Sequence, residues 1–127
     1  MFRRTTQKND INQQEISTLV GDGFVLTGDL SGKAVIRVDG EITGKVTAGG
    51  LVLGEKGMIT GDIEVTSAII YGTVNGNVKA RQLEIKKTGK VNGDIKTETL
   101  EIELGAQYNG KLEMKQLIKS NEKPAEH

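Results

Sequence analysis

Several residue types are missing or scarce in this chain of 127 residues, and each absence removes a class of function. Cysteine does not occur, which excludes disulfides, thiol nucleophiles and thiolate metal sites and fits a reducing cytoplasm. The only histidine is His127, the last residue, so no histidine base or histidine metal site is expected. The serines have no candidate base at a recognisable spacing. We therefore expect no enzyme activity, no cofactor and no metal site.

Net charge and long apolar runs are also absent. The 17 basic and 17 acidic residues give a formal net charge of zero, which leaves little field to attract nucleic acid. Arg81, Lys86 and Lys87 form a small basic cluster, which we interpret as a solvated face. No segment approaches the roughly 18 apolar residues of a membrane helix, and no secretory signal is visible. These features predict a cytoplasmic protein that does not bind nucleic acid.

Aromatic residues make up 3% of the chain and proline occurs once, whereas glycine occurs 17 times. Six glycines recur at spacings of 16, 17, 15, 17 and 17 residues: Gly28, Gly44, Gly61, Gly76, Gly93 and Gly110. Each has a large apolar residue two positions before it and another two positions after it, from Leu26 and Leu30 at the first glycine to Tyr108 and Leu112 at the last. This alternation is typical of strands that bury one face.

The period is too short for a helical hairpin repeat or a propeller blade, and it suits one coil of a β-solenoid. A second apolar run follows in each repeat: Val35–Val38, Leu51–Leu53, Ala68–Tyr71, Leu83–Ile85 and Leu100–Ile102. The sequence therefore predicts an all-β solenoid (β-helix) of about six rungs, with three short strands per rung and a core of Val, Ile and Leu. Further glycines stand four residues upstream of the first set, at Gly40, Gly57, Gly72 and Gly89. We expect them at corners with positive φ.

Stacking also places the polar residues of successive repeats in columns. The residues after the six glycines are Asp29, Lys45, Asp62, Asn77, Asp94 and Lys111, an order that never sets like charges side by side. The residues before the glycines, all Thr or Asn, are expected to form a hydroxyl and amide ladder. A cation stripe along the three aspartates is interrupted by Lys45 and Asn77, so we interpret these positions as turn residues.

The two ends of the chain differ from the middle. Residues 1–15 and 118–127 are polar and lack apolar periodicity, so we expect two disordered tails around a β-solenoid domain at 16–117. The end rungs of such a domain have only one neighbour, and exposed strand edges above an open apolar core attract another copy. We therefore expect end-to-end polymerisation without nucleotide. The predicted contact residues are Leu19, Val20 and Phe24 at one end and Tyr108, Leu112 and Met114 at the other.

An alternative is a non-polymerising binding module closed by a cap. In that case Lys115–Lys119 fold over the last rung, with Leu117 and Ile118 facing inward.

Several segments resemble the bactofilins, small bacterial cytoskeletal proteins. They are Thr18-Leu19-Val20-Gly21, Gly28-Asp29-Leu30, the run from Ile36 to Gly44, and the repeated Gly-x-apolar-x-Gly through Gly93. The resemblance covers about residues 16 to 115 and implies a right-handed triangular β-helix that polymerises into filaments without overall polarity. It further implies a membrane-associated scaffold that recruits other proteins for cell shape, cell-wall organisation, polar organisation or motility.

Two parts of the chain can be compared with that family in more detail: the last rung and the N-terminal segment. Bactofilins tend to have phenylalanine in the last rung, where this chain has Tyr108, whose hydroxyl needs a partner when buried. Met1-Phe2-Arg3-Arg4 is similar to the family's short membrane-targeting peptide, although an ordinary initiating Met with a solvated tail is the alternative. So short a segment holds a monomer weakly, but a filament with many copies gains avidity. We expect filaments at the inner face of the cytoplasmic membrane.

Overall fold

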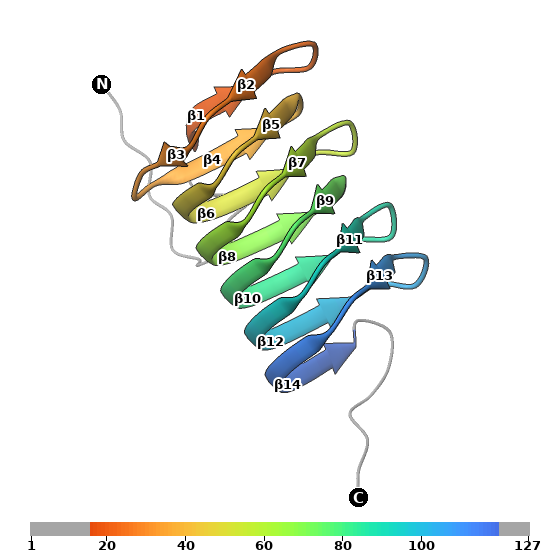
Figure 1. Cartoon of the computed structure of the whole chain (residues 1–127). Coiled ribbons are helices and arrows are strands. Elements are labelled where there is room, and N and C mark those ends of the chain that lie inside the picture. The colour runs from red at the N-terminus through yellow and green to blue at the C-terminus, as the bar shows by residue number, and fades with distance from the viewer. Residues whose placement is uncertain (1–15, 120–127) are drawn as a thin grey trace, which may run out of the picture.

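A computed structural model describes residues 16–119, and every regular element in that range is a β-strand. The strands form a stack of rungs, each made of one long strand and one short strand (Figure 1). The long strands are β6 (Val46–Leu53), β8 (Ile63–Ile70), β10 (Val78–Ile85), β12 (Ile95–Ile102) and β14 (Leu112–Lys119). The short strands are β2 (Val25–Thr27), β5 (Glu41–Thr43), β7 (Met58–Thr60), β9 (Thr73–Asn75), β11 (Lys90–Asn92) and β13 (Gln107–Asn109). The first rungs also contain β1 (Ile16–Val20), β3 (Leu30–Ser31) and β4 (Val35–Val38).

All strand pairs are parallel and belong to two sheets. The larger sheet has the order β1-β4-β6-β8-β10-β12-β14, with β3 beside β6, and the smaller has the order β13-β11-β9-β7-β5-β2. Each long strand turns a corner at its middle: in β10, Val78 and Ala80 are buried, Arg81 and Gln82 are exposed, and Leu83 is buried again. A rung therefore has three sides, which confirms the predicted all-β solenoid and identifies the third predicted strand as the second half of the long one.

Most of the uneven glycine spacing comes from the turn that joins one sheet to the next short strand, and one further residue is inserted between β3 and β4 in the first repeat. This turn has four residues at 54–57, 86–89 and 103–106 but two residues at 39–40 and 71–72. Turn length changes on the outside of the rod, where an insertion costs little. The stacked strands keep their register because the extra residues lie outside the sheets.

The core is a stack of aliphatic side chains that point into the rod. Ile42, Ile59, Val74 and Val91 form one inward column, and each is at most 1% exposed. Each rung places its apolar residues directly on those of the rungs before and after it. Branched aliphatic side chains fill so narrow an interior efficiently.

The first glycine column is needed for both conformation and space. Its six members have φ between 133° and 154°, a region that residues with a Cβ avoid. A Cβ added to Gly76 would also lie 2.1 Å from the carbonyl oxygen of Gly61 in the preceding rung. The backbones of successive rungs thus approach most closely along this column.

The second glycine column has a different cause from the one predicted. Gly40, Gly57, Gly72 and Gly89 are not among the residues with positive φ, so that prediction was wrong. A Cβ on Gly72 would instead meet the carbonyl oxygens of Gly54 and Gly57 at 2.3 and 2.4 Å. Close packing of the turns, rather than an unusual backbone angle, requires glycine here.

Side chains of the polar column after the first glycines form hydrogen bonds between successive rungs. The backbone N–H of Lys45 donates to Asp29 Oδ1 at 3.0 Å, and that of Asn77 donates to Asp62 Oδ1 at 3.2 Å. The backbone N–H groups of Asp94 and Lys111 likewise donate to Asn77 Oδ1 and Asp94 Oδ1. Asp and Asn therefore serve as acceptors for the next rung, which explains their recurrence. In the Thr and Asn column, Asn92 Nδ2 donates to Asn75 Oδ1 at 3.0 Å.

Candidate polymerisation surfaces

The two ends of the stack carry the strands that have a single neighbour. In the larger sheet these are β1, β3 and β14, and in the smaller sheet they are β2 and β13. Figure 1 shows β1 and β2 together at one end and β13 and β14 together at the other. Backbone groups on the outer edges of these strands are available for pairing with another chain.

The N-terminal end has an incompletely covered core. Val20, Leu26 and Leu30 are half-buried and pack against the core from one side. Phe24, in the turn before β2, is 70% exposed, and the neighbouring Val25 is 65% exposed. Predicted contact residues Val20 and Phe24 thus lie at this end of the stack.

Leu19 belongs to the same end but faces another direction. It is 62% exposed, and its register partner is Arg37 on the outer face of β4, while the next residue, Val20, packs against the core. Leu19 therefore points to the side of the rod. Its role in end contacts stays a prediction.

The C-terminal end presents the other three predicted residues. Leu112 is 38% exposed, whereas Ile95, its register partner in β12, is 2% exposed. Met114 and Tyr108 are half-buried and pack against the core. All three continue core columns that no further described rung covers.

The Tyr108 hydroxyl has a partner within its own rung. It donates a hydrogen bond to the backbone carbonyl of Lys111. Burial raises the pKa of Tyr108 above its usual value, which keeps the hydroxyl protonated and able to donate. The ring can thus occupy an apolar column while its polar end is satisfied.

Sequence reasoning missed other apolar residues at the two ends. Val25 and Leu104 are 65% and 77% exposed, in the first and last rungs, and Ile102 and Ala106 cover the core only partly. Ala106 could have been found from the second glycine column, because it stands where earlier repeats have a turn glycine. Val25 and Leu104 have no such signal because they stand outside the inward columns.

Residues 115–119 continue the last strand of the large sheet. They belong to β14, where Leu117 and Ile118 pair in parallel register with Leu100 and Glu101 of β12. A cap folded over the rod end would break this register. The capping arrangement considered from the sequence is therefore not the one that the chain adopts.

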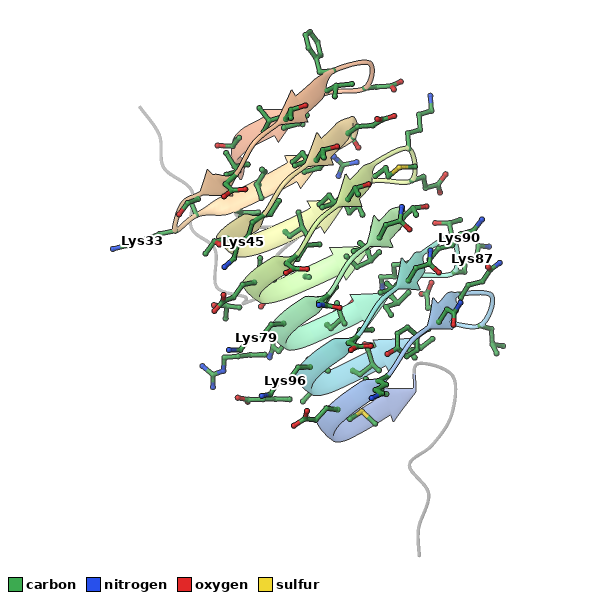
Figure 2. All side chains as sticks on the ribbon, in the orientation of Figure 1. Lys33, Lys45, Lys79, Lys87, Lys90 and Lys96 are labelled. Atoms are coloured by element: carbon green, nitrogen blue, oxygen red, sulfur yellow. The ribbon has the colours of Figure 1, made fainter. Side chains whose placement is uncertain are left out.

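Two of the three side chains in the basic cluster, Arg81 and Lys86, form ion pairs with carboxylates. Arg81 lies 3.6 Å from Glu98, and Lys86 lies 3.1 Å from Glu84 and 3.7 Å from Glu103. The lysines labelled in Figure 2 lie on two sides of the rod, with Lys87 and Lys90 away from the others. This distribution gives no continuous basic surface among them for a nucleic acid backbone.

The proposed membrane residues Met1, Phe2, Arg3 and Arg4 lie outside the described residues. Between residues 16 and 119, no helix is long and apolar enough to cross a membrane. The same range contains no group of three or more His, Cys, Asp or Glu side chains that could hold a metal ion.

Sequence comparison connects this repeat with a known family. The bactofilin family model, described as polymer-forming cytoskeletal, matches residues 18–113. Bactofilin BacP of Myxococcus xanthus (strain DK1622) is 30% identical over 76 residues, which cover 58% of this chain and 32% of BacP. The match thus spans about a third of the length of that relative.

Structural comparison agrees. Thermus thermophilus bactofilin, solved by cryo-EM as double helical filaments, matches with a TM-score of 0.71 and 28% identity over 76% of this chain and 98% of that one. A crystal structure of a phenylalanine-to-arginine mutant of Thermus thermophilus bactofilin shares the fold, with a TM-score of 0.52 and 24% identity over 80% of this chain and 97% of that one. The chain belongs to the bactofilin family of polymer-forming cytoskeletal proteins.

Proposed function

We propose that this chain polymerises by end-to-end stacking of its solenoid, without nucleotide, into filaments that act as a cytoskeletal scaffold. The observation that carries the proposal is the open core at both ends. Leu112 is 38% exposed in a column whose preceding member, Ile95, is 2% exposed. A further rung supplied by another copy would cover Leu112 as Leu112 covers Ile95.

The energetic balance supports such a contact. Burying a large apolar side chain contributes roughly 1.5 to 3 kcal/mol, and each end offers several that are partly covered. Strand edges add backbone hydrogen bonds of about 1 kcal/mol each. Together these terms compete with an association cost of about 4 to 15 kcal/mol. Apolar burial and strand pairing need no nucleotide, so none is required for this association.

The same proposal places the filament at the inner face of the cytoplasmic membrane. Its support is the sequence Met1-Phe2-Arg3-Arg4, which offers two apolar side chains and two cations to an anionic lipid surface. Filaments display this segment many times, so weak individual contacts add up. A membrane-bound filament then recruits other proteins for cell shape, cell-wall organisation, polar organisation or motility.

Negative-stain electron microscopy of the untagged full chain, at physiological salt and without nucleotide, tests the polymer. We expect long thin filaments. Discrete small particles of uniform size would contradict end-to-end stacking and indicate a non-polymerising binding module. Co-sedimentation with anionic vesicles then tests the membrane contact, with Arg3→Glu combined with Arg4→Glu as the variant that should lose binding while it keeps the filaments.

A further inference from the structure

The outer face of the small sheet carries little charge. The middle residue of each of its six short strands packs in or against the core, so the first and third residues point outward. In register these residues form two columns, Val25, Glu41, Met58, Thr73, Lys90 and Gln107 in the first, and Thr27, Thr43, Thr60, Asn75, Asn92 and Asn109 in the second. We call these two columns the ladder face. Glu41 and Lys90 are its only charged residues.

The large sheet presents a different surface. The outward column on the first half of its long strands is charged at every position after Thr47, through Glu64, Lys79, Lys96 and Glu113. Such a column favours contact with water. The ladder face, with its hydroxyl and amide groups and two exposed apolar side chains, Val25 and Met58, is better suited to contact with another protein surface.

The two charges of the ladder face have no partner in their own chain. Glu41 and Lys90 are exposed, and neither forms an ion pair within residues 16–119. They belong to β5 and β11, which lie three rungs apart (Figure 1), or about 14 Å at the usual strand spacing. A single rod therefore leaves both charges unmatched.

Reversing the rod end for end makes the first column complementary to itself. β5 is the second strand from one end of the small sheet, and β11 is the second strand from the other end. Two ladder faces can be laid against each other with the rods antiparallel and a two-fold axis between β7 and β9, along the strand direction. Glu41 of each copy then lies opposite Lys90 of the other, and the symmetry makes this pair twice.

The same two-fold axis matches two more columns. In the second column of the ladder face each Thr of one copy meets an Asn of the other, and both groups can donate and accept hydrogen bonds: Thr27 with Asn109, Thr43 with Asn92, and Thr60 with Asn75. The polar column after the first glycines, at the corner that borders this face, gives Asp29 with Lys111, Lys45 with Asp94, and Asp62 with Asn77. None of the three columns sets like charges opposite each other.

We propose that the ladder face binds the ladder face of a second copy, with the two rods antiparallel. Parallel rods related by a two-fold axis along their length would instead bring the first column of one copy against the second column of the other. Glu41 would then lie opposite Thr43 and Lys90 opposite Asn92, so both charges would stay unpaired. The antiparallel arrangement is the one that the charges favour.

The size of the face determines which species pair. Six rungs of three-residue strands give a flat footprint of about 300 Å² per copy, whereas a stable complex of separate proteins needs about 800 Å² per partner. Single rods should therefore not stay paired. This step rests on the proposed polymerisation, because a filament repeats the face at every subunit and its weak contacts add up. The contact then joins filaments side by side in pairs.

Exchanging the two charges tests the pairing. Negative-stain class averages of full-chain filaments at low salt show how many rods lie across each filament. We expect paired filaments for the wild type and single filaments for Glu41→Lys and for Lys90→Glu, since each substitution sets like charges opposite each other. The double variant Glu41→Lys with Lys90→Glu should restore the pairs. Recovery cannot come from within one chain, where the two residues lie three rungs apart.

Lys79→Glu is the matched control, because it makes the same charge change at an exposed position on the large sheet. It should leave the filaments paired. Single filaments in the wild type, or a double variant that stays single, would overturn the inference while leaving the proposed polymerisation intact. A wild type without any filaments would overturn both, so the two failures are distinguishable in the same images.

Discussion

The middle rungs and the end rungs share one sequence pattern but differ in how completely their core residues are buried. Val46, Ile63, Val78 and Ile95 form a column in which each residue is at most 2% exposed. Leu30 and Leu112 occupy the same column at its two ends, where Leu30 is half-buried and Leu112 is 38% exposed. The difference teaches that burial in a solenoid depends on the next rung as much as on the residue itself.

The largest expected effect comes from the glycine column. Gly76→Ala would bring a Cβ within 2.1 Å of the Gly61 carbonyl oxygen at a φ of 154°. We expect a loss of about 4 kcal/mol or more in the free energy of unfolding. Urea denaturation followed by circular dichroism measures it.

Gly28→Ala is the matched control at the end of the rod. Gly28 also has positive φ, at 133°, but a Cβ there would meet nothing within 4 Å. We expect only the conformational cost, about 1 to 3 kcal/mol. Equal losses at Gly28 and Gly76 would show that close approach between rungs is not what the column requires.

A smaller effect is expected from truncating the core column. Ile95→Ala removes a side chain that is 2% exposed and should cost about 3 kcal/mol of unfolding free energy. Leu112→Ala, at the exposed end of the column, should cost the monomer about 1 kcal/mol. Denaturation at low protein concentration compares the two, and equal costs would mean that Leu112 already has a full set of neighbours in the monomer.

The smallest effect concerns the acceptor ladder. Asp62→Ala removes the acceptor of the Asn77 backbone N–H, which lies 3.2 Å from Asp62 Oδ1, and should cost about 1 kcal/mol. Asp62→Asn keeps an amide oxygen and should cost less, as Asn77 itself accepts from Asp94. Thermal unfolding distinguishes them. Similar losses for both variants would indicate that charge, and not the hydrogen bond, is what position 62 contributes.

The fold could be predicted from the sequence because a solenoid repeats its physical requirements in every rung. Gly76, like the other internal members of its column, lies against the carbonyl oxygen of the glycine in the preceding rung. The same requirement therefore recurs in every repeat, and the pattern is visible without homologues. The inward columns follow from alternation around those glycines. The predicted corner φ at Gly72 was wrong because its neighbours, the turns at Gly54 and Gly57, come from another rung and leave no local signal.

Which apolar residues face outward could not be predicted, because this also depends on how the rungs pair with one another. The runs Leu51–Leu53 and Ala68–Tyr71 are apolar at successive positions, so alternation does not say which members face inward. Only the register of the sheet separates Val52 and Ile69 from the core. Leu19 was grouped with the end contacts because its place in β1, opposite Arg37, depends on that same register.

The most direct test of end-to-end assembly compares one end residue with one residue from the middle of the rod. Leu112 and Met58 are 38% and 37% exposed, but Leu112 continues a core column at the last rung whereas Met58 lies in β7, an internal strand. Sedimentation of the full chain should give pelleted filaments for the wild type and for Met58→Asp, and a soluble, folded protein for Leu112→Asp. Filaments that persist in Leu112→Asp, or that are lost equally in Met58→Asp, would contradict assembly through the open ends of the solenoid.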